Sequence, residues 1–328
     1  MTPPTPPTPA FLFQQQVREL LGQLPPLRDG EKEAVHHARV TTRRLREILG
    51  VYEAAHAPHA EDMKDRVRKV GRSLGPVREL DVIRDVLDEL DTRVPAAMGA
   101  IAAARSAVTQ ELQAARRKMI KTIERLEIDR LAERMPTKGQ WLSLPGLRAR
   151  QWTHALRSQI GERADMLSAA VDHASGVYFP KRAHAARVAA KKLRYNLELA
   201  DVTALWQPPR LLRDLKRVQE TLGELHDRQV ILDRLEGLLP KRVAAERDVL
   251  NGVLLSDVAR LHEVYLETRG RLHAMCGACQ RFSDPRGGRR RHWPLAASAV
   301  ALPTAVLLLG TRAPIAAEST PLQIAAAR

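Results

Sequence analysis

Cysteine and aromatic residues are scarce in this chain of 328 residues. The two cysteines, Cys276 and Cys279, form one C-x-x-C pair, which is too few for a disulfide framework and lacks the second ligand pair of a structural zinc site. Only 4% of the residues are aromatic, so binding of single strands by base stacking is not favoured. Runs that alternate Val, Ile or Thr with polar residues are also rare, whereas Leu, Ala, Arg and Glu are abundant. This composition predicts an all-α fold.

Sequence motifs of phosphate-transferring enzymes are absent as well. The chain has no G-x-x-x-x-G-K-[ST] loop and no comparable glycine-rich turn that would cradle a nucleotide. Asp81, Asp85 and Asp227 are the carboxylates considered as metal ligands, but among so many arginines we interpret them as ion-pairing partners. No two histidines stand four residues apart, as a histidine metal site on one helix would need. The sequence therefore predicts a binding protein without catalytic residues, metal or cofactor.

Acidic residues are outnumbered by basic ones. The chain carries 53 Lys and Arg against 38 Asp and Glu, a formal net charge of +15. With 44% apolar residues it can still bury a substantial core, so the excess charge belongs to a folded surface rather than to a disordered polyelectrolyte. Such a balance implies an acidic partner, which is nucleic acid, a membrane surface or polyphosphate. Charge alone does not choose among these.

Proline marks the organisation along the chain. Five prolines between residues 3 and 9 predict an extended, disordered leader that ends near residue 13. No basic segment followed by an apolar run opens the chain, so no secretory signal is predicted and the cytoplasm is the expected location. Helical periodicity predicts one domain over residues 14–280, with a helix break at Gly75-Pro76 and a connection at Pro136–Pro145. The two halves on either side of this connection span about residues 14–135 and 147–280.

The last part of the chain differs in composition. Residues 281–328 begin with five arginines up to Arg291 and continue with an uncharged segment of 18 residues, Trp293–Gly310. That length is at the lower limit for crossing a bilayer, and Pro294 and Pro303 make the segment a poor helix. We therefore favour a disordered tail, with a membrane anchor as the alternative.

An internal repeat at a constant offset organises the predicted helices. Residues 36–46 and 184–194 align without gaps, with six identities and two Arg-to-Lys changes over eleven positions. The same offset of 148 residues aligns Leu74-Gly75 with Leu222-Gly223. Separate matches at one offset are not expected from chance. The sequence therefore predicts two similar helical units in one chain, each with the same basic element.

The repeated element has a cationic face. At about 100° per residue, its histidine and the basic residues that follow fall on one side of a helix, and the alanine and leucine positions fall on the other. The face comprises His36, Arg39, Arg43 and Arg46 in the first copy and His184, Arg187, Lys191 and Arg194 in the second, with Arg44 and Lys192 at its edge. Cations stacked in this way repel one another, so an anion is expected to compensate them.

The following helix extends the basic surface. Its predicted ligands are Lys64, Arg68 and Arg72 in the first copy, Lys216 and Arg217 in the second, and Arg78 and His226 at equivalent positions after the Leu-Gly step. Arg suits phosphate because it donates bidentate hydrogen bonds, Lys adds a point charge, and His donates more strongly when protonated. A single basic stripe is usually a solvated face, but duplication of the whole set favours a linear polyanion that gains from both copies.

The chain resembles the CHAD family, the conserved histidine α-helical domain, in two motifs that occur once in each half. The first half contains His36-x-x-Arg39-Val40-x-x-Arg43-Arg44-Leu45-Arg46 and then Leu74-Gly75-Pro76-Val77-Arg78-Glu79-Leu80-Asp81-Val82. The second half contains His184-x-x-Arg187-Val188-x-x-Lys191-Lys192-Leu193-Arg194-Tyr195 and then Leu222-Gly223-Glu224-Leu225-His226-Asp227. Glu79 and Gln229 stand where the family usually has Asp. The resemblance covers about residues 14–280.

The resemblance implies both a fold and a function. The implied fold is two pseudo-symmetric four-helix bundles in one domain, with a central basic cavity or groove. The implied function is binding of inorganic polyphosphate without hydrolysis through the basic residues named above and Tyr195, and we expect recruitment to polyphosphate granules. Nucleic-acid binding without sequence specificity stays open as the alternative, because counterion release rewards any polyanion on a basic surface. Neither the oligomeric state nor a preferred polyphosphate length is predicted.

Overall fold

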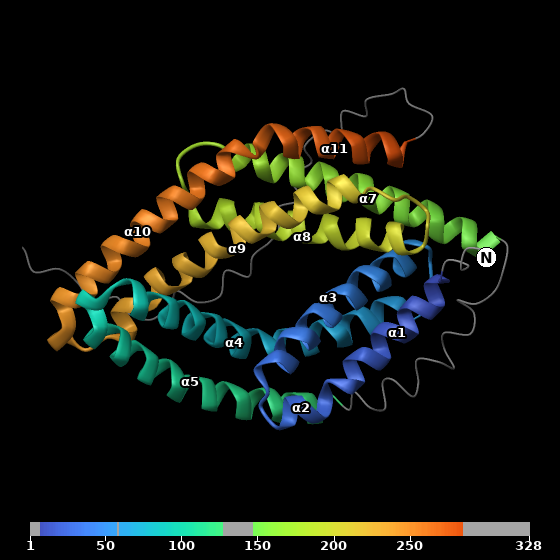
Figure 1. Ribbon diagram of the computed structural model, residues 1–328. Coiled ribbons are helices and arrows are strands. Elements are labelled where there is room, and N and C mark those ends of the chain that lie inside the picture. Colours follow the sequence, from blue (N-terminus) through green and yellow to red (C-terminus); the bar gives the residue numbers. More distant parts are fainter. Residues whose placement is uncertain (1–6, 58, 127–146, 285–328) are drawn as a thin grey trace, which may run out of the picture. The chain divides into compact units, whose positions relative to one another are not determined.

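Helices account for the regular secondary structure in the described part of the protein (Figure 1). The computed structural model describes residues 7–57, 59–126 and 147–284. No strand occurs in these ranges, so the predicted all-α fold is confirmed. The described residues all fall within one structural unit, Met1–Gly287.

The first half of the chain folds as a series of helices that pack on their neighbours in sequence. The helices within residues 7–126 are α1 (Pro9–Gly22), α2 (Leu24–Arg28), α3 (Lys32–Ala54), α4 (Ala60–Arg93) and, after a 3-10 turn η1 (Pro95–Ala97), α5 (Met98–Arg125). Helix α3 packs on α1 and α4, and α4 packs on α5. The basic segment predicted around His36 therefore lies on a helix, α3, that packs on both α1 and α4.

The second half repeats this order. Its helices within residues 147–284 are α7 (Leu147–His173), α8 (Pro180–Val202), α9 (Pro209–Leu238), α10 (Ala244–Glu267), which follows a 3-10 turn η3 (Lys241–Val243), and α11 (Arg269–Ser283). Helix α8 packs on α7 and α9, α9 packs on α10, and α11 packs back on α7. Helices α3 and α8 begin and end 148 residues apart, which is the offset of the sequence repeat. The two halves meet where α3 contacts α7 and α8, and where α4 and α5 contact α9.

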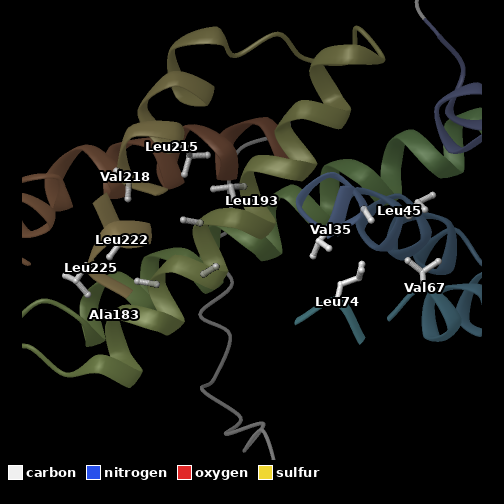
Figure 2. Close-up of a cluster of buried hydrophobic side chains, with 14 of the residues drawn as sticks. Val35, Leu45, Val67, Leu74, Ala183, Leu193, Leu215, Val218, Leu222 and Leu225 are labelled. Atoms are coloured by element: carbon white, nitrogen blue, oxygen red, sulfur yellow. The ribbon is translucent and has the colours of Figure 1, made fainter. Parts of the chain in front are cut away.

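Figure 2 shows core side chains at equivalent positions of the two repeats. The pairs are Val35 and Ala183, Leu45 and Leu193, Val67 and Leu215, and Leu74 and Leu222. No member of these pairs is more than 4% exposed. Burial of a leucine or valine side chain stabilises the fold by roughly 1.5–3 kcal/mol, so both halves fix the same helix faces toward the core. The basic residues lie on the opposite faces of these helices and do not contribute to this apolar core.

The predicted break at Gly75-Pro76 is wrong, because α4 continues through it. Pro76 has no N–H and leaves one backbone carbonyl of the preceding turn without its helical bond, which costs about 3 kcal/mol. Leu74 and Val77 on either side are fully buried, and so are Val67 and Val70 one to two turns earlier. The packing of this apolar stripe offsets the cost of the proline and keeps the helix continuous.

The predicted leader is too long, since α1 begins at Pro9. The Thr8 side chain accepts a hydrogen bond from the N–H of Phe11 at 3.2 Å and caps the helix, and proline is favoured at the first helical position. Phe13 is 2% exposed and packs edge-on against Tyr52, with 6.4 Å between ring centroids. The high proline content of the first residues therefore led to a wrong prediction of extended chain where a capped helix begins.

Several predicted segments lie outside the described residues. These are residues 1–6 of the leader, the connection Pro136–Pro145, and the tail from residue 285, which includes Trp293–Gly310. Helix α11 extends three residues past the predicted end of the domain at 280. Among the described helices, none is long and apolar enough to cross a membrane.

Candidate anion-binding cavity

A cavity of about 360 Å³ lies where α3 and α4 face α8 and α9. Its basic lining residues are His36, Arg39 and Arg43 on α3, Arg78 on α4, Arg187 and Lys191 on α8, and His226 on α9. All of them belong to the set of ligands predicted from the sequence. Two carboxylates, Glu79 and Asp227, complete the charged lining. The two copies of the basic element thus converge on one space.

The repeat offset relates the two walls of this cavity. Arg39 corresponds to Arg187, Arg43 to Lys191, Arg78 to His226, and Glu79 to Asp227. Each position keeps a basic or an acidic residue in both copies, although the residue type differs at three of the four. The first wall carries permanent guanidinium charges where the second carries an amine and an imidazole. The two walls of the cavity therefore carry the same pattern of basic and acidic positions.

Helix packing places Arg39 inside the cavity. Ala38 and Leu45 on the same helix are fully buried, which directs the opposite face of α3 toward the cavity. The Nη1 atom of Arg39 donates to the backbone oxygen of Gly71 at 3.5 Å. A Cβ atom on Gly75 would stand only 3.2 Å from this Nη1 atom. The missing side chain of Gly75 therefore leaves the space that the guanidinium occupies.

The cavity cations lack carboxylate partners in the described part of the chain. Arg43, Arg78, Arg187 and Lys191 make no hydrogen bond there, and none has a carboxylate oxygen within 4.0 Å. The Nε atom of Arg187 is also buried without a hydrogen-bond acceptor. By contrast, the buried Arg228 outside the cavity is paired with Glu89 at 2.6 Å. Donors of this strength normally meet an anion, so the cavity is suited to bind one.

Burial and mutual repulsion hold down the pKa values of the cavity cations. Burial, and then repulsion by Arg187 and Arg43, lowers the pKa of Lys191 to about 6. Burial and then Arg187 lower the pKa of His226 to about 4, and burial and then Arg43 lower that of Arg39 to about 10. Burial also lowers the pKa of His36, an effect that Arg78 strengthens. A bound anion would relieve this repulsion and favour the charged forms.

Comparison with known proteins identifies the family of this chain. The family model of the CHAD domain matches residues 12–236. The chain belongs to the CHAD domain family. Its structure is similar to the crystal structure of the CHAD domain from the plant Ricinus communis, with a TM-score of 0.61 and 21% sequence identity over 85% of this chain and 94% of that chain. At this identity the likeness supports the fold alone. No curated protein matches the chain.

A second group of predicted ligands forms a basic strip beside the cavity of this CHAD domain. The strip consists of Arg46, Lys64, Arg68, Arg72 and Lys192. Burial lowers the pKa of Arg46, and Arg68, Arg43 and Arg72 are close enough to lower it further. Arg43 therefore joins the strip to the cavity. Two members have partners of their own, because Lys64 pairs with Glu53 and Arg68 lies 3.0 Å from Asp65.

Three predicted ligands lie outside both the cavity and the strip. Arg44 and Tyr195 line a different cavity of about 320 Å³ against α1. Glu198 lies 3.6 Å from Arg44 and 3.2 Å from Arg194, whose guanidinium is 5.3 Å from the centre of the Tyr195 ring. The first repeat has Gly50 where the second has Glu198, so Arg46 has no such carboxylate although it is the counterpart of Arg194. The two copies of this position therefore differ in their surroundings.

The remaining predicted ligands lie outside the cavity lining too. Lys216 and Arg217 are exposed on the outer face of α9, where Glu220 is 3.9 Å from Lys216. His184 does not line the cavity, but its ring lies 4.7 Å from that of His226. The sequence repeat aligns Lys216 with Arg68, but Lys216 is exposed whereas Arg68 is half-buried and lies close to Arg46. This CHAD domain thus concentrates only part of the predicted set at the cavity.

A polar cluster around Glu47 was missed in the sequence. Glu47 is 8% exposed, and its Oε2 atom accepts from Asn196 at 3.0 Å, Gln159 at 3.3 Å and Arg163 at 3.5 Å. These partners come from α7 and α8, so the cluster joins the first half to the second. Glu47 lies next to Arg46 in sequence, but its partners are too far away in the chain for periodicity to reveal them.

Two of the three carboxylates considered as metal ligands are ion-paired, whereas Asp227 has no Lys, Arg or His nitrogen within 4.0 Å among the described residues, contrary to its interpretation as an ion-pairing partner. Arg116 lies 3.5 Å from the buried Asp81 and Lys32 pairs with Asp85, which confirms the interpretation of both carboxylates as ion-pairing partners. Cys276 and Cys279 are buried in α11, and burial raises the pKa of each thiol to about 12. Within the described ranges, no three His, Cys, Asp or Glu residues are grouped so as to hold a metal ion.

Proposed function

We propose that this CHAD domain binds inorganic polyphosphate without hydrolysing it, and that this binding recruits the protein to polyphosphate granules. The polymer lies in the cavity and continues along the basic strip. The observation that carries the proposal is the convergence of two equivalent cationic walls whose arginines and lysine have no carboxylate partner within 4.0 Å among the described residues. Repeated phosphates match repeated cations, and occupation of both walls by one chain adds avidity.

The dimensions of the site suit a polymer better than a single phosphate. From Arg39 to Arg46, α3 rises by about 10 Å at 1.5 Å per residue. The cationic side chains along this distance are Arg39, Arg43 and Arg46, and Arg72 approaches Arg46 from the next helix. An extended polyanion can contact all of these groups at once. Bidentate contacts from arginine also fix the orientation of each phosphate.

Nucleic acid is the competing ligand, because the net charge of +15 attracts any polyanion. The test is competition at a physiological ionic strength of about 0.15 M. Labelled long-chain polyphosphate is bound to the protein, and duplex DNA, single-stranded RNA or unlabelled polyphosphate is then titrated in, matched by phosphate concentration. We expect polyphosphate to displace the label at a concentration at least about ten-fold lower than either nucleic acid does, a preference of about 1.4 kcal/mol. Equal or stronger displacement by DNA or RNA would overturn the proposal.

Substitution of Gly75 by alanine tests the space that Arg39 occupies. The added Cβ would stand 3.2 Å from Arg39 Nη1, so the guanidinium must shift by a few tenths of an ångström within the cavity. We expect polyphosphate affinity to fall by about three- to ten-fold, which corresponds to roughly 0.7–1.4 kcal/mol. Fluorescence anisotropy with labelled polyphosphate measures the change.

The equivalent glycine in the second repeat provides the matched control. Gly223 has no heavy atom within 4 Å of the position of an added Cβ. Gly223→Ala should therefore leave affinity unchanged and raise the free energy of unfolding by about 0.5–1 kcal/mol, as helix propensity predicts. If Gly75→Ala and Gly223→Ala bind equally well, the position of Arg39 does not matter for the ligand.

A further inference from the structure

The two walls of the cavity differ in their response to pH. Arg43 on the first wall corresponds to Lys191 on the second, and Arg78 corresponds to His226. A guanidinium stays charged throughout the physiological range, whereas an amine or imidazole in a repelling environment loses its proton there. The second wall can therefore gain positive charge when an anion arrives. The first wall gains less, because its arginines are already charged and His36 is its one imidazole in the cavity lining.

Lys191 shares the cavity with arginines on α3, α4 and α8 and with two titratable groups on α9. The groups that face it are Arg187 and His184 on α8, His36, Arg39 and Arg43 on α3, Arg78 and Glu79 on α4, and His226 and Asp227 on α9. Its ammonium makes no hydrogen bond and no ion pair within 4.0 Å with a described residue. Burial and the arginines lower its pKa to about 6. Asp227 offsets only part of this repulsion.

We infer that polyphosphate binding is coupled to proton uptake at Lys191, with His226 and its ring neighbour His184 as secondary acceptors, so that affinity rises as the pH falls. This inference rests on the proposed function of the cavity. Bound phosphates place negative charge beside the amine and favour its ammonium form. The step is a protonation alone, in which a solvent proton adds to the Nζ lone pair and no bond in the polymer changes.

The direction of the pH dependence follows from the free and bound states. Above about pH 6 the free protein holds Lys191 mainly as the neutral amine. The pKa of Lys191 is higher in the complex, so between the two values binding takes up as much as one proton. Each proton taken up makes the affinity fall by at most about ten-fold per pH unit as the pH rises. His226 has a lower pKa in the free protein and adds to the uptake toward acidic pH.

The uptake can be measured by isothermal titration calorimetry with long-chain polyphosphate. Titrations at about pH 7.5 in two buffers of different ionisation enthalpy give the number of protons bound. Long chains are used because only terminal phosphates titrate near pH 6, and these are few. We expect uptake of about half a proton to one proton, and an affinity that falls by about three- to ten-fold from pH 7 to pH 8.

Lys191→Arg fixes the charge and restores the residue type of the first wall. We expect this variant to bind polyphosphate with proton uptake reduced by more than half, whereas Lys121→Arg, at an exposed position on α5, keeps the uptake of the unmodified protein. Unchanged uptake in Lys191→Arg would overturn the assignment to this lysine. Binding of the unmodified protein without proton uptake would overturn the coupling but not the proposed function. An absence of binding at every pH would overturn both.

Discussion

Polyphosphate affinity is expected to fall at least about 100-fold when Arg39 and Arg187 are both changed to glutamate, a loss of about 2.8 kcal/mol. These arginines occupy equivalent positions on the two walls of the cavity. Each charge-assisted hydrogen bond to phosphate contributes roughly 1.5–3 kcal/mol, and each new carboxylate also repels the ligand. Anisotropy titrations with labelled long-chain polyphosphate measure the loss.

The fold should survive this double substitution. A carboxylate introduced at either position faces Arg43 and Arg78, which have no carboxylate oxygen within 4.0 Å in the described part of the chain. The new charges therefore meet cations that are free to pair with them, and repulsion within the cavity decreases. Helical circular dichroism and the melting temperature are expected to stay close to those of the unmodified protein. A loss of helical signal would show that the two arginines are structural.

A control with the same change in net charge separates local from overall electrostatics. Arg117 on α5 and Arg213 on α9 are exposed and lie outside the cavity lining. Their double change to glutamate should lower affinity by no more than about three-fold at an ionic strength of about 0.15 M, where charges more than about 8 Å away are largely screened. If both double variants lose affinity equally, overall charge holds the ligand and the cavity does not.

The largest expected effect on stability comes from Glu47→Ala. This change removes one of the two acceptors of the buried Asn196 amide, the acceptor of buried Gln159 and the carboxylate partner of Arg163. Breaking a buried charged cluster by removal of one member costs about 3–5 kcal/mol, and the 23% exposure of the Arg163 side chain favours the lower end of that range. We expect the free energy of unfolding in urea to fall by about 3 kcal/mol, because the contact between α3 and the second half is weakened.

Glu53→Ala on the same helix is the matched comparison. Glu53 pairs with Lys64, but the side chains are 38% and 36% exposed, so solvent screens this pair. Its removal should cost no more than about 1 kcal/mol. Equal losses for Glu47→Ala and Glu53→Ala would mean that the buried cluster does not join the two halves.

The sequence predicted the cavity lining well because two periodicities act together. The helical repeat of 3.6 residues places Arg39 and Arg43 on one face, and the 148-residue offset places Arg187 and Lys191 on the matching face of the other half. Buried leucines fixed the rotation of both helices. The all-α fold followed from the same pattern, and the family resemblance is confirmed over residues 12–236.

Where the structure differs from the sequence predictions, the causes are other residues on the same helix for Arg194 and contacts across the fold for Pro76 and Glu47. Periodicity placed Arg194 with the cavity residues, but Glu198 and the contact with Tyr195 hold it elsewhere. The helix through Pro76 persists because packing outweighs a local preference. No sequence pattern indicated the buried cluster around Glu47, because its partners belong to α7 and α8. Local patterns give the face of a helix, whereas the contacts across the two halves decide which residues share a site.

The packing order of the helices also bears on how the chain gains its structure. In the first half α3 packs on α4 and α4 on α5, so each helix finds its partner in the adjacent segment. Contacts of this kind close short loops and form quickly. In the second half α7 packs on α11, which follows only after α8, α9 and α10. During synthesis from the N-terminus, the first half can therefore condense early, while the face of α7 that packs on α11 stays uncovered until the end of the domain has been made.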